Sequence, residues 1–362
     1  MKDTQGTVAV AGGGVIGLSI AWRAATAGWR VTVYDPNPIE RSTSWVAGGM
    51  LAPMTEGWPG EERLLELGVA SLRRWDEFAA ALADFGSSVV TAHSTITVAA
   101  DEADVRDLHR VRDWLDQHNH CVTALTRAEL RQAEPELARS LRPGFAVSDE
   151  RAVDNRTLVR ALAAACAAAG VRMTPHRVQN VASLHEDQVV VATGPWTSTL
   201  LSRMPVRPVK GEVLRLRKRP GSPDPPSATV RAVIHGRPVY LVPRPDGVVV
   251  GATQYEAGFD TQVTAGGVRD LLADAEIVFP GLSEYEFAEA IAGMRPMTPD
   301  NLPILGRLDE RVTIAAGHGR GGILLAPLTA DAVVAELAGA PLDETKYTDP
   351  RRFRNCHDKC DA

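Results

Sequence analysis

The pattern of apolar and polar positions along the chain predicts buried strands alternating with amphipathic helices. Short continuous apolar runs, typical of parallel strands covered on both faces, occupy 8–11, 30–34, 188–192 and 312–316. Apolar residues at helical spacing predict helices at 18–27, 61–85, 101–118, 155–169 and 267–278, and a last one ending at Leu337. Strands of the parallel kind are therefore expected at the start, in the middle and at the end of the chain.

The segment from Lys210 to Thr253 follows a different pattern, one typical of antiparallel hairpins. The runs 239–243 and 248–252 flank Arg244-Pro245-Asp246-Gly247, in which proline and glycine favour a tight turn. Two further short strands are predicted within 89–99, and Thr126 with Glu129 forms a capping box for a short helix.

This order of elements predicts an α/β fold (α+β overall). We expect a Rossmann-like nucleotide-binding domain interrupted by an antiparallel-β substrate domain with helices. The expected limits are 1–88, 145–207 and 293–345 for the nucleotide-binding domain, 89–144 and 208–292 for the substrate domain, and 346–362 for a tail. The substrate is expected where the two domains meet, because pockets tend to form there.

A glycine-rich turn follows the first predicted strand and precedes the first predicted helix. Gly12 permits the sharp turn, Gly14 lets the backbone approach a pyrophosphate, and Gly17 lets helix and strand pack closely. The helix N-terminus offers free N–H groups to phosphates. Asp35 ends the second strand, eighteen residues after Gly17, where a carboxylate can accept hydrogen bonds from a ribose. The sequence therefore predicts a dinucleotide site.

Three predicted strand ends are rich in glycine, which favours a long, flat cofactor lying across several strands. They are 12–17, the Gly194-Pro195-Trp196 segment, and 317–322. FAD fits this distribution better than NAD, whose second half usually requires a second βαβ unit. An NAD-dependent dehydrogenase is the alternative, but it leaves 317–322 without a role.

Composition narrows the class of protein further. The 362 residues carry a net charge of −6, which argues against nucleic acid as a partner. The densest basic patch is 215–219, and the charged and apolar residues at its start alternate as in a strand with one solvent-exposed face. No apolar run approaches the ~20 residues of a membrane helix. Asp3 argues against a signal peptide, and four scattered cysteines suit a reducing compartment, so a cytoplasmic protein is expected. Cys356, His357 and Cys360 make too poor a ligand set to predict a metal.

Three side chains are candidates for holding a substrate. Arg295 precedes Pro296, which places it on extended backbone, where its guanidinium suits a carboxylate; a structural salt bridge is the alternative. Tyr240 can contribute its hydroxyl to the same carboxylate or serve as a core aromatic. Arg320 lies within the last glycine loop. His318 beside it suits a structural hydrogen bond better than a catalytic base.

With these residues in place, the chain resembles the FAD-dependent glycine oxidases of thiamine biosynthesis, within the D-amino-acid oxidase superfamily. The resemblance runs from residue 8 to about residue 353. It is carried by AGGMLAP at 47–53, PVKGE at 208–212, VYLVPR at 239–244, GMRP at 293–296 and GHGRGGILLAP at 317–327. Many relatives carry asparagine where Gly321 stands, so hydrogen bonding at the flavin edge is expected to differ.

The resemblance implies noncovalent FAD and assigns roles residue by residue. FAD contacts are implied for Val15, Ile16, Asp35, Thr43, Ser44, Gly48, Gly49, Met50, Val178, His318, Gly319, Arg320, Gly321, Gly322, Ile323 and Leu324. The strand ends add Gly12, Gly14, Gly17, Gly194 and Trp196 to the expected cofactor site. Arg295 becomes the expected carboxylate clamp, assisted by Tyr240 and Arg320 and bordered by Met50.

The implied reaction is hydride transfer from the α-carbon of glycine to flavin N5. It yields the imino acid and, with oxygen, hydrogen peroxide, and it needs no acid or base from the protein. In the thiamine pathway the imine would supply the thiazole. Sarcosine or a D-amino acid as substrate, an acceptor other than oxygen, and a catalytically silent nucleotide-binding module remain alternatives. Relatives form homo-oligomers, so a homo-oligomer is expected.

Overall fold

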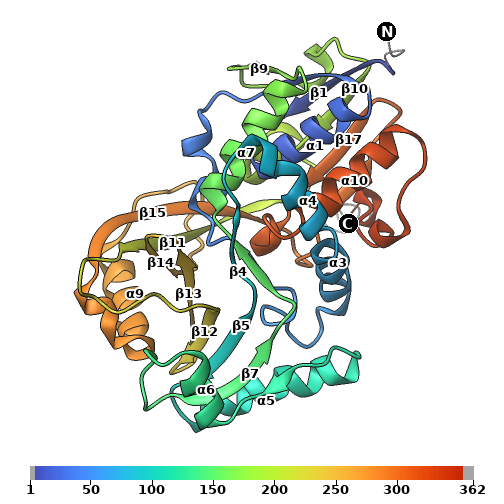
Figure 1. Ribbon diagram of the computed structural model, residues 1–362. Helices are drawn as coiled ribbons and strands as arrows, with labels where there is room; N and C mark the ends of the chain where they lie inside the picture. Colours follow the sequence, from blue (N-terminus) through green and yellow to red (C-terminus); the bar gives the residue numbers. More distant parts are fainter. Residues whose placement is uncertain (1–4, 354–362) are drawn as a thin grey trace.

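The computed structural model describes residues 5–353, and the Cys356–Cys360 region considered above lies outside them. Two bodies are stacked along the long axis of the molecule (Figure 1). One is built on a six-stranded sheet and the other on an eight-stranded sheet, with a small three-stranded sheet between them. The predicted α/β fold with an inserted antiparallel part is confirmed.

The six-stranded sheet brings together the start, middle and end of the chain. Its order is β16 (Ile304–Arg307), β17 (Val312–Ala316), β10 (Gln188–Val191), β1 (Thr7–Ala11), β2 (Arg30–Tyr34) and β9 (Arg172–Thr174). All neighbours are parallel except β16 and β17, which run antiparallel. The parallel strands expected at the start, middle and end of the chain are therefore confirmed, whereas β16 was not predicted.

Three helices of twelve or more residues share one core with this sheet. These are α1 (Val15–Thr26), α7 (Asn155–Ala168) and α10 (Ala326–Leu337). Helix α1 contacts both of the others, and its buried residues include Leu18 and Ile20. Helix α7 is capped by Asp154, whose side chain accepts a hydrogen bond from the Thr157 N–H at 2.7 Å.

The helix predicted at 61–85 is interrupted. It consists of α3 (Glu62–Leu72), α4 (Trp75–Leu82) and a 3₁₀ turn at Ala83–Phe85. At the break, Ser71 Oγ and Trp75 Nε1 both donate to the Leu324 carbonyl, at 2.7 and 2.8 Å. This tertiary contact holds the two helices on the segment that precedes α10.

The eight-stranded sheet forms the second body. Its order is β15 (Glu286–Met297), β11 (Arg207–Arg217), β14 (Gly247–Gly251), β13 (Arg237–Arg244), β12 (Thr229–Ile234), β5 (Thr95–Ala99), β7 (Arg142–Val147) and β6 (Thr123–Ala124). Only β12 and β5 are parallel neighbours. The predicted 239–252 hairpin is confirmed as β13–β14, and Arg295 lies on the extended strand β15, as expected.

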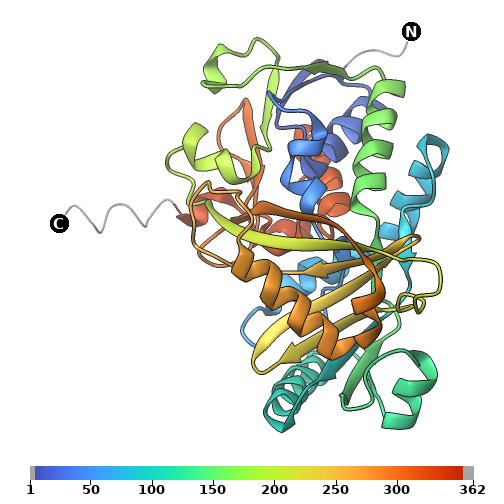
Figure 2. The same ribbon diagram turned by 90° about the vertical axis from the view of Figure 1, so that its left-hand side faces the viewer.

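Helices also cover this second sheet. Helix α9 (Ala265–Val278) crosses one face and contacts β11, β13 and β14 (Figure 2). Helix α5 (Glu102–Gln117) contacts β5 and β7 and is capped by Asp101, and α6 (Arg127–Ala133) begins with the predicted capping box. None of the helices among residues 5–353 is long and apolar enough to cross a membrane.

A short helix and a small sheet lie between the two bodies. Helix α2 is Thr43–Val46, and the three-stranded sheet has the order β3 (Met50–Leu51), β8 (Arg151–Val153) and β4 (Val90–Ala92). Strands β7 and β15 both run through expected domain limits, at 144–145 and 292–293. The domain limits therefore stay a prediction.

Candidate functional site

A cleft of about 360 Å³ runs from the carboxyl ends of β1 and β2, past α2, to strands β13 and β15. It is lined by most of the residues that the sequence singled out. These are Gly12, Gly14, Val15, Ile16, Asp35, Thr43, Ser44, Gly48, Gly49, Met50, Val178, Gly194, Trp196, Tyr240, Arg295, His318, Gly319, Arg320, Gly322 and Ile323. One continuous space thus joins the candidate dinucleotide site to the candidate substrate residues.

The glycine turn has the close approaches that its sequence predicts. Gly12 has φ +112°, and a Cβ added there would lie 2.2 Å from the Ala192 carbonyl oxygen. A Cβ on Gly17 would lie 1.9 Å from the Gly12 carbonyl oxygen. Gly17 therefore serves the packing of α1 on the turn and does not line the cleft.

The N-terminus of α1 faces this cleft and suits an anion. Gly14 is the N-cap residue and brings no side-chain cap of its own, and the first turn contains no acidic residue. A helix N-terminus with this character attracts phosphate through its N–H groups and its dipole.

Asp35 lies beside the turn with its carboxylate already oriented. Its Oδ2 accepts a hydrogen bond from the Gly13 N–H at 2.6 Å, and its Oδ1 accepts one from the Asn37 N–H at 2.9 Å. Each carboxylate oxygen keeps a further lone pair for a ligand hydroxyl.

The segment 43–50 forms one wall of the cleft and is held by a buried asparagine. Asn155 is fully buried, and its Nδ2 donates to the Ser44 and Trp45 carbonyls, both at 2.8 Å. Ser44 Oγ in turn accepts from the Val15 N–H at 2.9 Å, so this wall is tied to the start of α1.

A buried arginine holds the other end of the same wall. Arg244 Nη2 donates to the Gly48 carbonyl at 2.7 Å, while its Nε lies 3.2 Å from Asp154 Oδ2. Burial lowers the pKa of Arg244 to about 10, which still leaves it charged near neutral pH. Sequence reasoning missed Asn155 and Arg244 as site residues, because their only local signals were a helix cap and a turn.

At the far end of the cleft, the Arg295 guanidinium lies between strand β11 and the residues that follow β14. Its Nη1 donates to the carbonyl of Thr253 at 3.1 Å and to that of Lys210 at 3.5 Å. A Cβ on Gly211 would lie 2.1 Å from the same Nη1, so only glycine leaves room for this side chain.

Tyr240 lies in the same part of the cleft. Its hydroxyl oxygen would be 2.2 Å from a Cβ on Gly251 and 2.9 Å from one on Gly48, so two glycines make space for the ring. Burial raises the pKa of Tyr240, and its hydroxyl is therefore a neutral hydrogen-bond donor.

Arg320 lines the cleft but is already engaged. Its guanidinium forms an ion pair with Glu61 and donates to the Glu56 carbonyl at 3.1 Å. Glu56, a lining residue that sequence reasoning missed, forms an ion pair with Arg231 at 3.0 Å. Arg231 Nη1 also lies 3.8 Å from Met50 Sδ.

Residues of the last glycine loop, 317–324, line two different cavities. Gly321 and Leu324 line a smaller neighbouring cavity and not the large cleft. His318 lines both, and its Nε2 lies 3.0 Å from Thr329 Oγ1. Burial lowers the pKa of His318 to about 3, so the ring is neutral and serves a structural hydrogen bond.

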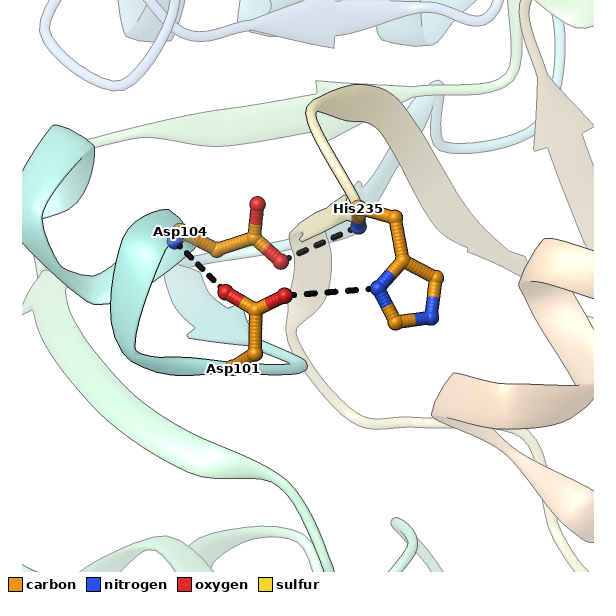
Figure 3. Close-up of side chains that lie close together, drawn as sticks. All are labelled: Asp101, Asp104 and His235. Atoms are coloured by element: carbon orange, nitrogen blue, oxygen red, sulfur yellow. Dashed lines mark hydrogen bonds and ion pairs between the residues drawn. The ribbon is translucent and has the colours of Figure 1, made fainter.

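Asp101, Asp104 and His235 form a cluster of potential ligand atoms outside the cleft (Figure 3). Hydrogen bonds account for their arrangement. Asp104 accepts from the N–H groups of His235 and Gly236 at 3.0 and 2.9 Å. Asp101 caps α5 and accepts from the N–H groups of Ala103 and Asp104. The cluster thus anchors the β12–β13 turn to the helix.

Comparisons with known proteins agree with this geometry. A family model described as FAD dependent oxidoreductase matches residues 7–337. The bifunctional protein ThiO/ThiG of Trichormus variabilis is 32% identical over 346 residues, covering 91% of this chain but 52% of that protein. The chain therefore spans about half the length of that relative.

Two relatives are similar over most of their own length. Glycine oxidase from Geobacillus kaustophilus is 32% identical over 346 residues, with 89% of this chain and 90% of that protein covered. Its crystal structure superimposes with a TM-score of 0.87 over 96% of this chain and 98% of that one, at 30% identity. A putative thiamine biosynthesis oxidoreductase, ThiO, of Rhizobium etli is 33% identical over 339 residues, covering 91% of this chain and 96% of that protein.

Proposed function

Because this chain belongs to the family of FAD-dependent oxidoreductases, we propose that it oxidises glycine and other small amines with oxygen as acceptor. The observation that carries the proposal is one cleft joining the dinucleotide turn to Arg295 and Tyr240. The two relatives named for glycine oxidation and for thiamine biosynthesis support the choice of substrate.

The residues of the cleft fit noncovalent FAD. The Gly12 turn leaves space that any Cβ would fill, the start of α1 suits the pyrophosphate, and Asp35 suits the ribose. The wall at 43–50 is held in place by hydrogen bonds from Asn155 and Arg244. When bound, FAD supplies the acceptor for two electrons and the hydride of the substrate α-carbon.

The protein's own contribution is to bind and orient the amino acid. Arg295 can grip a carboxylate with two parallel N–H donors, and the neutral hydroxyl of Tyr240 can donate to the same group. The Thr253 and Lys210 carbonyls direct the guanidinium, which reduces the freedom lost when substrate binds.

Among the described lining residues, the obvious candidates for a proton acceptor are committed elsewhere. His318 is buried and hydrogen-bonded, Tyr240 stays protonated, and Glu56 is paired with Arg231. The substrate amine therefore enters in its free-base form. The products are the imino acid, which in the thiamine pathway supplies the thiazole, and hydrogen peroxide.

Replacing Arg295 by methionine tests the proposal. Losing a charge-assisted bond to the carboxylate removes about 1.5–3 kcal/mol, so the KM for glycine should rise about 10- to 100-fold while bound FAD is unchanged. The measurement is peroxide release against glycine concentration, with flavin absorbance reporting occupancy. The exposed Arg269 provides the matched control, Arg269→Met, which should leave KM unchanged. An unchanged KM in Arg295→Met would contradict the proposed role.

Substrate size and electron acceptor need separate measurements. Rates of peroxide release with glycine, sarcosine and D-alanine distinguish a glycine oxidase from a sarcosine or D-amino-acid oxidase. Oxygen consumption distinguishes an oxidase from a dehydrogenase, because the latter would bleach with glycine and reoxidise slowly in air.

A further inference from the structure

Strand β11 carries two fully buried charged side chains that the proposed reaction does not use. Lys210 is 1% exposed and Glu212 is 0% exposed, and Lys210 Nζ lies 3.7 Å from Glu212 Oε1. Burying an ion pair often contributes no net stability over an apolar pair of similar size. We therefore expect this buried pair to have a role other than stability, in positioning the segment that it binds.

Both side chains bind the segment 253–264, which connects β14 to α9. Glu212 accepts from the Thr264 N–H at 2.8 Å and from Thr253 Oγ1 at 3.2 Å. Lys210 Nζ donates to Asp260 Oδ2 at 2.6 Å and to the Gln262 carbonyl. The two charges thus hold this segment at its beginning, middle and end.

The same segment forms part of the environment of the cleft. The Thr253 carbonyl accepts the hydrogen bond from Arg295 Nη1. Further along, the Phe259 ring stacks on Trp196, a lining residue, with ring centroids 6.1 Å apart. A shift of the segment would therefore move both the partner of the guanidinium and one aromatic wall.

We infer that Lys210 and Glu212 are positioning residues that hold the segment 253–264 so that the Thr253 carbonyl aims Arg295 at the substrate carboxylate. The inference rests on the proposed role of Arg295. The buried pair acts at a distance from the substrate, through one backbone carbonyl and one guanidinium.

The test compares three single variants of the FAD-loaded enzyme. Glu212→Gln keeps the size of the side chain but removes its charge and one acceptor. Asp260→Asn removes the charge of one of the two carboxylates paired with Lys210, at a side chain that is 45% exposed, so folding is not at risk. Asp270→Asn, at an acid that is 49% exposed on α9, is the matched control.

The probe is glycolate, a carboxylate without an amine, titrated against the flavin absorbance. Glu212→Gln should raise the Kd for glycolate and the KM for glycine about tenfold, with kcat and the Kd for FAD nearly unchanged. Asp260→Asn should raise the same two constants by a smaller factor, and Asp270→Asn should not change them. A purely structural role would instead change FAD retention and thermal stability without this separation of KM from kcat.

A double-mutant cycle shows whether the effect passes through Arg295. In an Arg295→Met background, Glu212→Gln should change the Kd for glycolate by less than about twofold, because the group being positioned is gone. An equal effect in both backgrounds overturns the inference. If Glu212→Gln fails to fold, an unchanged Kd in Asp260→Asn overturns it equally.

The outcome also separates this inference from the proposed function. If Arg295→Met leaves the Kd for glycolate unchanged, the proposed carboxylate clamp itself is wrong. If Arg295→Met weakens glycolate but neither Glu212→Gln nor Asp260→Asn does, only the positioning role is wrong.

Discussion

At the scale of single residues, neighbouring atoms lie so close to some positions that only glycine fits there. Gly12 and Gly17 were identifiable from sequence, because a glycine turn between strand and helix has a known spacing. Gly211 was not, since the side chain that needs its space, Arg295, lies 84 residues further along the chain. A local sequence pattern predicts local geometry, whereas the need for glycine at position 211 comes from its contact with the distant Arg295 side chain.

His318 shows how burial decides the chemistry of one residue, and it predicts a pH dependence of stability. Its folded pKa of about 3 lies below the usual 6.5, so the unfolded chain takes up a proton that the folded chain does not. The free energy of unfolding should therefore fall as the pH is lowered below about 6.5. Replacing His318 by glutamine should remove that part of the dependence.

Denaturant unfolding at pH 7.5 and 5.5 measures the difference, with the exposed His185 changed to glutamine as a control. An identical loss of stability in the wild type and in His318→Gln would show that the imidazole is protonated in the fold.

At the scale of elements, hydrogen bonds from buried polar side chains hold short helices in place against longer ones. Helix α2 has only four residues and cannot be stable alone, yet it lines the cleft. It is held because Asn155, at the start of α7, donates to two of its carbonyls. The sequence predicted helix α7, but not that its first turn supports α2.

Truncating this residue, Asn155→Ala, should therefore weaken cofactor binding. The Ser44 carbonyl loses its bond from Asn155 and the Trp45 carbonyl keeps only the 3.4 Å bond from Arg156 Nε, at about 1–3 kcal/mol for a buried group left unpaired. The Kd for FAD of the apoprotein, measured by flavin fluorescence, should rise about tenfold or more.

Cys166→Ala is a matched control on the same helix, since Cys166 is fully buried, lies eleven residues after Asn155 and donates its thiol to the Leu18 carbonyl. It should change thermal stability while leaving the Kd for FAD as in the wild type. Equal Kd values for FAD in all three proteins would refute the supporting role of Asn155.

At the scale of the whole molecule, the cleft is bordered by both large sheets, and the ligand that fills it should stabilise the fold as a unit. The turn at β1 belongs to one sheet, and Tyr240 and Arg295 belong to the other. FAD bound only by the folded chain adds about 2.7 kcal/mol at a hundredfold excess over Kd.

Removing FAD should accordingly lower the melting temperature by roughly 3–4 °C, and re-adding FAD should restore it in proportion to the logarithm of its concentration. Differential scanning fluorimetry measures this shift. NAD at the same concentration is the control and should give no shift. Stabilisation by NAD but not by FAD would point back to the dehydrogenase alternative.

The sequence alone predicted the parallel strands at the start, middle and end of the chain, most of the long helices, and the glycine turn with Asp35, because these depend on residues close together in the chain. The strand, turn, helix and acid between residues 7 and 35 lie as their spacing predicts. Tertiary structure alone decided that Arg320 is paired with Glu61, that Gly321 and Leu324 line a separate cavity, and that Lys210 and Glu212 are buried behind Arg295. The physical reason is that the role of a charged side chain depends on the groups that pair with it. These groups lie on strands and loops that only folding brings together.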